Sequence, residues 1–402
     1  MNALPWQRPN ATEAFAAESL ANALGYLAFP WATWIDLARD HAPPPAPVAT
    51  APTSQPLATV GQHIEMLQHT TLLRSCGVTD LFWSHATQDL RHHQGLRIHP
   101  FPLYPVRCAT HPGCLPLQQR RWLYSFQGVY RPDLYLTPVR QWILDLPPRN
   151  DALLASRREW HFEQQVYREQ VHGQSPDSRR HAELTSEAAD YADTLQQSVF
   201  ALCPSGSGPN TIRLWEALGY GAIPVILADG LRLPGDSALW QQAALHVPET
   251  PQAVSALPAR LDALRADHAR LAAMQEAGQQ LWQRYGLPGF VDDIRTWQND
   301  VDGFLLRAAR QRLPADPELL QAEQPASLPL QLRQCLRRIP PEQPLLLQIA
   351  DPSPLPLLET RWRVPLKMCA QLIAGRTWAI ASRSPVLEQL VDPAAQPPGV
   401  HA

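Results

Sequence analysis

Residues 200–229 read FALCPSGSGPNTIRLWEALGYGAIPVILAD, a pattern that predicts a strand, a flexible loop, a helix, a tight turn and a second strand. The two glycines of the loop let the backbone approach a ligand closely, and Pro209 suits the first turn of the helix. The free N–H groups at the start of a helix bind anions, and nearby hydroxyls add donors. We therefore predict an anion site made by Ser205, Gly206, Ser207, Gly208, Asn210 and Thr211.

Two charged residues follow on the same predicted helix. Arg213 and Glu216 are three positions apart and therefore share a face. The cation would lie beside a diphosphate, and the carboxylate would accept hydrogen bonds from ribose hydroxyls. The alternative is a solvated salt bridge of little energetic value. Asp229, which ends the next strand, would line the same pocket, or would simply form a turn before Gly230.

Short apolar runs alternate with amphipathic stretches along most of the chain, which predicts an α/β fold with mainly parallel sheets. In such sheets ligands bind beyond the carboxyl ends of the strands. We predict strands at 25–29, 58–64, 80–85, 96–100, 122–128, 199–204, 222–228 and 244–247. We predict helices at 31–41, 65–76, 137–146, 151–171, 180–197, 209–220, 252–285 and 289–311.

Proline is unusually frequent, with 42 residues, and marks two segments. The run at 42–56 excludes a helix interior or a central strand, because proline lacks the N–H and has a fixed φ. It predicts a loop. The second enrichment covers 311–402, which we predict to be an irregular appendage with some structure of its own.

Bulk properties exclude several classes of protein. A net charge of −3 gives no excess positive potential for a nucleic acid backbone. Six scattered cysteines indicate reduced thiols and favour the cytoplasm. The first residues do not resemble a signal peptide, and no run approaches about eighteen apolar residues. We therefore expect no membrane-spanning segment, although peripheral membrane association stays open.

The segment CPSGSGPNTIRLWEALGYGAIPVIL resembles the donor-binding block of the exostosin family of glycosyltransferases, in particular its short bacterial members. Weaker similarities lie in the family's order at 25–37, 62–67, 79–86, 100–106, 124–130, 136–143 and 160–167. The resemblance implies a GT-B architecture, in which two Rossmann-like domains face each other across a cleft. We assign 1–117 to the N-terminal, acceptor-side domain, 118–310 to the nucleotide-sugar domain and 311–402 to the proline-rich extension. We expect the last helix, near 290–311, to cross back to the N-terminal domain.

One departure from related enzymes bears on the mechanism. Many retaining GT-B enzymes carry two glutamates eight positions apart, but Gly208 stands eight positions before Glu216. An inverting displacement fits better. The triplet Asp300-Val-Asp302 falls inside the predicted last helix, where we expect a solvated face rather than a metal site. The helix dipole and Arg213 would then stabilise the leaving diphosphate without a metal.

An inverting transferase needs a base near the acceptor hydroxyl. His63 and His85 each lie close to the carboxyl end of a predicted strand and are the candidates, with a structural role as the alternative for both. Asp80 and Glu65 are further alternatives.

Two other groups of residues are weaker candidates. His161 and Arg168 lie in a block that matches the family and would contact the ligand or merely pack in a helix. Cys108, His111 and Cys114 resemble part of a zinc knuckle, but only three ligands are evident. We therefore expect neither a metal nor a cofactor other than the donor substrate.

The sequence thus predicts a hexosyl- or glycuronosyltransferase that moves a sugar from a nucleotide sugar, most simply a UDP-sugar, to a hydroxyl of a surface glycan or glycoconjugate. One rival is a nucleotide-sugar epimerase or hydrolase on the same fold. The other is a non-catalytic nucleotide- or glycan-binding subunit.

Overall fold

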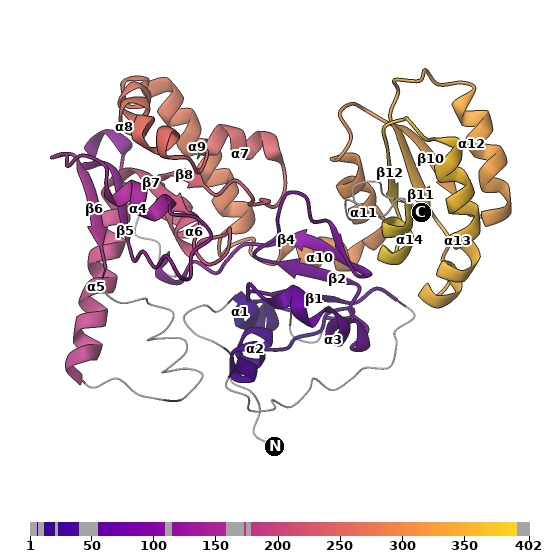
Figure 1. Cartoon of the computed structure of the whole chain (residues 1–402), viewed down its shortest axis with the longest axis horizontal. Coiled ribbons are helices and arrows are strands. Elements are labelled where there is room, and N and C mark those ends of the chain that lie inside the picture. The colour runs from indigo at the N-terminus through magenta and orange to yellow at the C-terminus, as the bar shows by residue number, and fades with distance from the viewer. Residues whose placement is uncertain are drawn as a thin grey trace.

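The structure is a computed structural model that describes Trp6, Gly173 and residues 12–20, 23–39, 55–108, 115–157 and 178–391. Three α/β units follow one another along the chain, and each has its own sheet (Figure 1). We call them the N-terminal domain, the second domain and the C-terminal unit.

The N-terminal domain has a four-stranded sheet of order β1-β2-β4-β3, in which only β3 is antiparallel. Its strands are β1 (Ala58–Gly61), β2 (Asp80–Trp83), β3 (His92–His93) and β4 (Leu96–Pro100). Its helices are α1 (Thr12–Ser19), α2 (Trp31–Arg39) and α3 (Thr70–Ser75), with short 3-10 turns at Met66–His69 and Val106–Cys108. The sheet is buried on both faces, as expected for parallel strands.

The second domain has a five-stranded, wholly parallel sheet of order β6-β5-β7-β8-β9. Helices cover both faces, so β7 and β8 are buried along their whole length and their sequences are almost continuously apolar. The strands are β5 (Trp122–Gly128), β6 (Ala152–Ser156), β7 (Ser198–Pro204), β8 (Ile223–Leu227) and β9 (Leu245–His246). The helices are α4 (Val139–Leu144), α5 (Ser178–Gln196), α6 (Ile212–Gly219), α7 (Ser237–Ala243), α8 (Pro251–Ala266) and α9 (His268–Tyr285), and a 3-10 turn at Leu117–Gln119 precedes β5.

After α9 the chain returns to the N-terminal domain, as expected. Helix α10 (Asp292–Asn299) buries Ile294 and Trp297 in the same apolar cluster as Val60 and Phe82. The predicted single helix is nevertheless broken at Asp300, whose side chain accepts a hydrogen bond from the N–H of Gly303 and so caps α11 (Val301–Arg310).

The C-terminal unit corrects our prediction of an irregular appendage. Its strands β10 (Glu318–Ala322), β11 (Leu345–Ile349) and β12 (Trp378–Ala381) form a parallel sheet in that order, with a buried core of its own. Its helices are α12 (Leu328–Leu336), α13 (Leu355–Leu372) and α14 (Pro385–Val391), with a 3-10 turn at Pro325–Ser327, and α11 packs on β12. Several prolines stand at the first positions of these helices, where a missing N–H breaks no helical bond.

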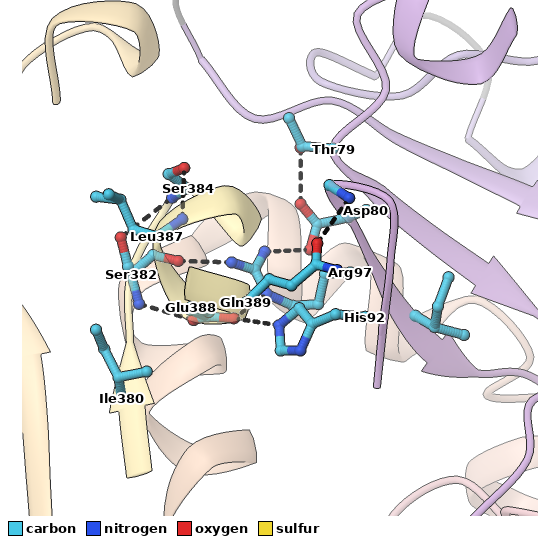
Figure 2. Close-up of polar contacts among 12 residues, drawn as sticks. Thr79, Asp80, His92, Arg97, Ile380, Ser382, Ser384, Leu387, Glu388 and Gln389 are labelled. Carbon is cyan, nitrogen blue, oxygen red and sulfur yellow. Dashed lines mark hydrogen bonds and ion pairs between the residues drawn. The ribbon is translucent and has the colours of Figure 1, made fainter. Parts of the chain in front are cut away.

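Buried charges fasten the C-terminal unit to the N-terminal sheet (Figure 2). Arg97 of β4 contacts Asp80 of β2 at 2.6 Å and Glu388 of α14 at 2.8 Å, and it donates to the Ser382 carbonyl at 2.6 Å. His92 contacts the same Glu388 oxygen at 2.8 Å. Both carboxylates are almost fully buried, so Arg97 is the charge that makes their burial possible.

The loop after β8 joins the second domain to the N-terminal domain. Leu231 forms an isolated antiparallel bridge with Thr87, and the N–H of Gln88 donates to the Gly230 carbonyl at 3.1 Å. The N–H of Arg232 donates to the Ala86 carbonyl at 3.0 Å. The two domains are thus in backbone contact at one point near the carboxyl end of β8.

Other element predictions were wrong in identifiable ways. The strand at 25–29 is reduced to one bridge between Tyr26 and Ala58, because Gly25 adopts a positive φ. Residues 152–156, predicted as the start of a helix, form the edge strand β6, and 158–172 lie outside the described residues. The helix at 252–285 is divided at Asp267, which caps α9 by accepting from the N–H of Arg270.

Candidate active site

A pocket of about 310 Å³ lies between the N-terminal and second domains. Both candidate bases and seven of the nine predicted donor residues line it: His63, His85, Gly206, Ser207, Gly208, Asn210, Thr211, Arg213 and Glu216. The first two come from the loops after β1 and β2, and the others from the loop after β7 and from α6 itself. The carboxyl ends of both sheets therefore face one pocket.

The loop that leads into α6 packs closely against side chains of the N-terminal domain. Gly208 lies against the imidazole of His85, and a Cβ at position 208 would also come within 2.8 Å of Ile64. Helix α6 begins at Ile212, three residues later than we predicted, so Pro209 belongs to the loop rather than to the first turn. Thr211 adopts an extended conformation at the N-cap, and its side chain makes no capping hydrogen bond. The first N–H groups of α6 therefore have no side-chain cap, and Thr211, Ile212 and Arg213 line the pocket at this helix end.

Asn210 holds the loop in place rather than presenting a free amide. Its Nδ2 donates to the carbonyl of Ser84 in the N-terminal domain at 2.7 Å. Its Oδ1 accepts from the N–H of Thr211 at 2.9 Å and from the indole of Trp215 at 3.0 Å. The side chain is buried, and its hydrogen bonds fix the donor loop against the opposite domain.

Arg213 is buried and aromatic groups surround it. Its guanidinium lies 4.6 Å from the ring centre of Phe126 and donates through Nη2 to the Gln127 carbonyl. Its Nε is enclosed and has no hydrogen-bond partner. No carboxylate of the described chain forms an ion pair with Arg213, so its positive charge is available to a ligand in the pocket.

Three further arginines line the pocket, and sequence reasoning did not assign them: Arg107, Arg140 and Arg157. Arg140 of α4 donates to the Ser205 carbonyl at 2.8 Å and lies 4.3 Å from the ring centre of Tyr135. Burial lowers the pKa of Arg140 to about 10, so it stays protonated at neutral pH. The sequence did contain a signal for Arg140, because it lies in the segment 136–143 that resembles the family. We assigned this arginine no role from the sequence.

Glu216 is the only acidic residue that lines the pocket, within the described part of the chain. Its two oxygens accept from the Arg107 N–H at 3.0 Å and from the Tyr191 hydroxyl at 2.7 Å. Burial raises the pKa of this carboxyl. Glu216 thus connects α6 to the chain after β4 and to α5, while each oxygen keeps a second lone pair for a ligand hydroxyl.

The two histidines differ in what their ring nitrogens contact. His63 Nδ1 accepts from the Glu65 N–H at 3.0 Å, and its Nε2 lies 3.3 Å from the buried Asp36 carboxylate. His85 Nδ1 is enclosed without a hydrogen-bond partner. Burial, reinforced by the nearby His63, lowers the pKa of His85 to about 3, so its ring is neutral at physiological pH. His85 therefore has one ring nitrogen without a protein hydrogen-bond partner, and this nitrogen is enclosed where the ring packs against Gly208.

Ser205 and Asp229 lie outside the pocket lining, contrary to our prediction. The Ser205 hydroxyl donates to Glu249 at 2.5 Å. The Asp229 carboxylate accepts from the Glu249 N–H at 3.1 Å. Both side chains therefore form hydrogen bonds with Glu249, which hold the ends of the loops after β7 and β8 outside the pocket.

Other predicted candidates fall beyond what the structure describes or have local partners. Asp80 pairs with Arg97, and the backbone N–H of Glu65 donates to His63. His161, Arg168 and the residues 109–114 of the possible zinc knuckle lie outside the described residues. Within the described ranges no cluster of three metal-ligating side chains occurs. None of the described helices combines the length and apolar composition that a membrane span requires.

Comparison with known proteins identifies the family. The family model described as Exostosin GT47 domain matches residues 61–261, which is half of the chain. The chain belongs to the exostosin GT47 family. The match extends from the end of β1 into α8 and therefore contains the whole pocket except its first lining residue, Ala32.

The similar curated proteins match over short segments. Exostosin-1 of Drosophila melanogaster is 36% identical over 102 residues, which are 24% of this chain and 12% of that protein. The probable glucuronosyltransferase Os02g0520750 of Oryza sativa subsp. japonica is 44% identical over 66 residues, 16% of this chain and 15% of that protein. The probable glucuronoxylan glucuronosyltransferase IRX7 of Arabidopsis thaliana is 45% identical over 62 residues, 15% and 14% of the two chains. The chain thus covers less than a fifth of each of these relatives.

Among solved structures, the pneumococcal O-GlcNAc transferase GtfA in complex with UDP and GlcNAc is similar at 12% identity and a TM-score of 0.31. The similarity covers 61% of this chain and 52% of that chain. The GT-B architecture that we expected is visible in the structure itself, as two α/β domains with parallel strands whose carboxyl ends face a shared pocket.

Proposed function

We propose that this protein is a glycosyltransferase that moves a sugar from a UDP-sugar to a hydroxyl of a glycan or glycoconjugate acceptor. The observation that carries the proposal is the charge of the pocket, where four arginines face one carboxylate beside the start of α6. A diphosphate carries the opposite charge and matches the donor N–H groups of the loop. The relatives named glucuronosyltransferases support transfer of a hexosyl or glycuronosyl group.

In this proposal, Gly206, Ser207 and Gly208 shape the diphosphate site while Arg213 and Arg140 neutralise it. Glu216 accepts a hydrogen bond from a ribose hydroxyl through its remaining lone pairs. As the bond between the sugar C1 and the phosphate oxygen breaks, the negative charge on the leaving diphosphate grows. Preorganised cations stabilise that charge without reorganisation, which lowers the barrier. We infer that these arginines perform this role without a metal ion.

His85 is the base that we propose for the acceptor hydroxyl. The hydroxyl proton passes to the His85 imidazole as the oxygen attacks C1 from the face opposite the diphosphate, which inverts the anomeric centre. Because Nδ1 is enclosed against Gly208, this step requires the loop before α6 to move when the acceptor binds. A pKa of about 3 makes the free imidazole a weak base. The negative charge of a bound diphosphate nearby stabilises the imidazolium and raises that pKa toward the working range.

The first experiment is calorimetric titration of the full chain with UDP and UDP-sugars. We expect UDP to bind, and binding to weaken about tenfold or more when Arg213→Ala or Arg140→Ala removes a charge-assisted contact. The matched control is Arg333→Ala, on a helix of the C-terminal unit. If no uridine diphosphate binds, or if Arg213→Ala binds as the native chain does, the donor site is wrong.

The second experiment distinguishes the reaction classes. A transferase hydrolyses its donor slowly when alone and forms a new glycoside with an acceptor, whereas an epimerase or hydrolase needs no acceptor, and a non-catalytic subunit binds UDP without turnover. The anomeric configuration of the product by NMR tests inversion, and turnover in the presence of EDTA tests independence from metal.

We also propose that the reaction takes place in the cytoplasm, for surface polysaccharide or glycoconjugate synthesis. Support comes from the five cysteines that the structure describes, all of which are buried and none of which is in a disulfide bond. Peripheral association with a membrane that carries the acceptor is compatible with this proposal. Fractionation of cells that express the full chain tests the compartment.

A further inference from the structure

Helices α12 and α13 form the outer face of the C-terminal unit. Strands β10, β11 and β12 are parallel and lie in chain order, so right-handed crossovers put both helices on the same face of the sheet. Leu345 and Leu347 of β11 pack with these helices, whereas Leu346, which points to the other face, packs with α11. Figure 1 shows α12 and α13 at the edge of the molecule, on the side of the unit that faces away from the N-terminal domain.

Large apolar side chains are exposed on this α12–α13 face. They form a stripe along α13, where they are seven, four and four positions apart: Leu357, Val364, Met368 and Leu372. Leu330 is exposed on α12. Within the described ranges eight large apolar side chains are exposed, and five of them lie on these two helices. Such a concentration on one face indicates a contact surface, whereas single exposed apolar residues would not.

The exposed charges of the same face are all positive. They belong to the two helices and to the C-cap residue of α12: Arg333, Arg337, Arg363 and Lys367. None of these four side chains forms an ion pair or a hydrogen bond within the described part of the chain. The only acidic residue of the two helices, Glu359, is half-buried and accepts from the Ser384 hydroxyl at 2.7 Å. The apolar stripe therefore lies among cations that no carboxylate of the helices neutralises.

We propose that the α12–α13 face binds the surface of a membrane that contains anionic lipids. In this arrangement the apolar stripe enters the boundary between the headgroups and the acyl chains. The guanidinium groups and the Lys367 ammonium group then contact lipid phosphates, and an anionic surface attracts each of them. A lipid surface thus matches both the apolar side chains and the charge of this face.

A protein partner fits this face less well. A symmetric contact between two copies would bring the same surface to both sides, so the cations of each copy would meet no carboxylate of the α12–α13 face. Tight protein interfaces use aromatic or arginine anchors in pockets. The only aromatic residue of the two helices, Trp362, is buried. Within the described chain, neither the pocket described above nor a second cleft, between β4 and α11, has a lining residue on α12 or α13. A fluid lipid surface needs no such pocket.

The proposal does not rest on the donor site, because α12 and α13 contribute no residue to the lining of that pocket. Membrane binding and UDP binding can therefore be lost independently of each other.

The test is co-sedimentation of the full chain with two kinds of vesicle, one of pure phosphatidylcholine and one of phosphatidylcholine and phosphatidylglycerol in equal amounts. We expect binding to the mixed vesicles that is about tenfold or more tighter than binding to the neutral ones, and that weakens as salt is added. Absence of binding to the mixed vesicles overturns the proposal. Equal binding to both kinds also overturns it, because the cations would then have no role.

Variants on the face locate the contact. Met368→Glu places a carboxylate in the apolar stripe, and the double change Arg363→Gln with Lys367→Gln removes two cations. All three residues are exposed on α13, and glutamate and glutamine are good helix formers, so folding is not at risk. Each variant should weaken binding to the mixed vesicles about tenfold or more. Native binding by both variants overturns the proposal.

Matched controls carry the same changes on other surfaces. Leu24→Glu alters an exposed leucine of the N-terminal domain, and the double change Arg260→Gln with Arg270→Gln removes two exposed cations of α8 and α9. Both should bind the mixed vesicles as the native chain does, and so should Arg213→Ala in the donor pocket. Equal loss of binding in these controls would indicate a general charge effect and would refute the assignment to the α12–α13 face.

Sedimentation velocity without lipid tests the alternative occupant. We expect Met368→Glu to have the same oligomeric state as the native chain. If the native chain forms dimers that Met368→Glu separates into monomers, a second copy covers this face and the membrane proposal is wrong.

Discussion

Glu388→Gln should loosen the C-terminal unit from the N-terminal sheet. One carboxylate oxygen accepts from both Arg97 and His92, and the other accepts from the Ser382 N–H at 2.8 Å. A glutamine in the same place must direct its NH₂ group either at Arg97 and His92 or at the Ser382 N–H. In both orientations a buried donor faces another donor, and Arg97 loses one of its two anionic partners.

The size of the effect follows from the contacts that remain. Removing one partner of a buried ion pair costs about 3 to 5 kcal/mol. Arg97 keeps Asp80 and the Ser382 carbonyl, so we expect about 3 kcal/mol, the lower end of this range. Hydrogen–deuterium exchange of peptides that cover β12 and α14 should then accelerate about a hundredfold.

The same variant has a pH signature. Burial alone would raise the pKa of Glu388, but Arg97 and His92 outweigh it and hold the pKa well below its usual range. A carboxyl with a depressed folded pKa stabilises the fold above its unfolded pKa, near 4.5, and this stabilisation is lost as the pH falls further. The difference in exchange between the native chain and Glu388→Gln should therefore be full at pH 7 and shrink below about pH 4.5.

The matched control is Glu342→Gln, an exposed glutamate of the same unit, which should exchange as the native chain does. The reasoning fails if Glu388→Gln leaves the protection of α14 unchanged at pH 7. It also fails if the difference is the same at pH 7 and pH 3.

Three further changes test the first pocket. Asn210→Ala removes the amide between the two domains and leaves buried partners unsatisfied, so unfolding in urea should show a loss of about 1 to 3 kcal/mol. Gly208→Ala places a methyl group against His85, and overpacking should cost about 1 to 3 kcal/mol and slow turnover. Glu216→Gln should weaken UDP binding about tenfold in calorimetry but cost only about 1 kcal/mol of stability, because the Tyr191 hydroxyl can reorient.

Each of these has a result that would contradict it. Native stability in Asn210→Ala would mean that water replaces the lost hydrogen bonds. A Gly208→Ala protein with native stability and turnover would show that the loop has room for a side chain. Unchanged UDP affinity in Glu216→Gln would limit this residue to holding α6, and Ser255→Ala serves as the neutral control for all three.

Local pattern was sufficient to predict the strand, loop and helix between Phe200 and Gly219, because apolar runs and glycines act over a few residues. It was not sufficient for the arginines. Arg107, Arg140 and Arg157 lie on three separate segments, and only folding brings them beside Arg213: Arg140 and Arg157 within the second domain, and Arg107 from the chain after β4. Nothing in the spacing of these four residues indicates that they share a pocket.

Proline composition misled the prediction for the C-terminal unit. A high proline count argues against regular structure only where proline interrupts a helix or strand. Here Pro329 stands in the first turn of α12 and Pro354 at the N-cap of α13, while Pro340 and Pro341 lie in the connection before β11. Pro365 is the exception, because it lies inside α13, and the helix continues through it. The apolar stretches LLLQI and WAIA were the better signal, because each is a central or edge strand of a parallel sheet.

The contact between Thr87 and Leu231 restrains the two domains relative to each other. A motion that separates the two domains at this point breaks the two backbone hydrogen bonds beside that bridge. It also pulls the Arg232 side chain from the Leu90 and Ile98 carbonyls. Each such bond contributes about 0.5 to 1.5 kcal/mol. This short strip of backbone therefore works as a latch between the two domains that line the pocket.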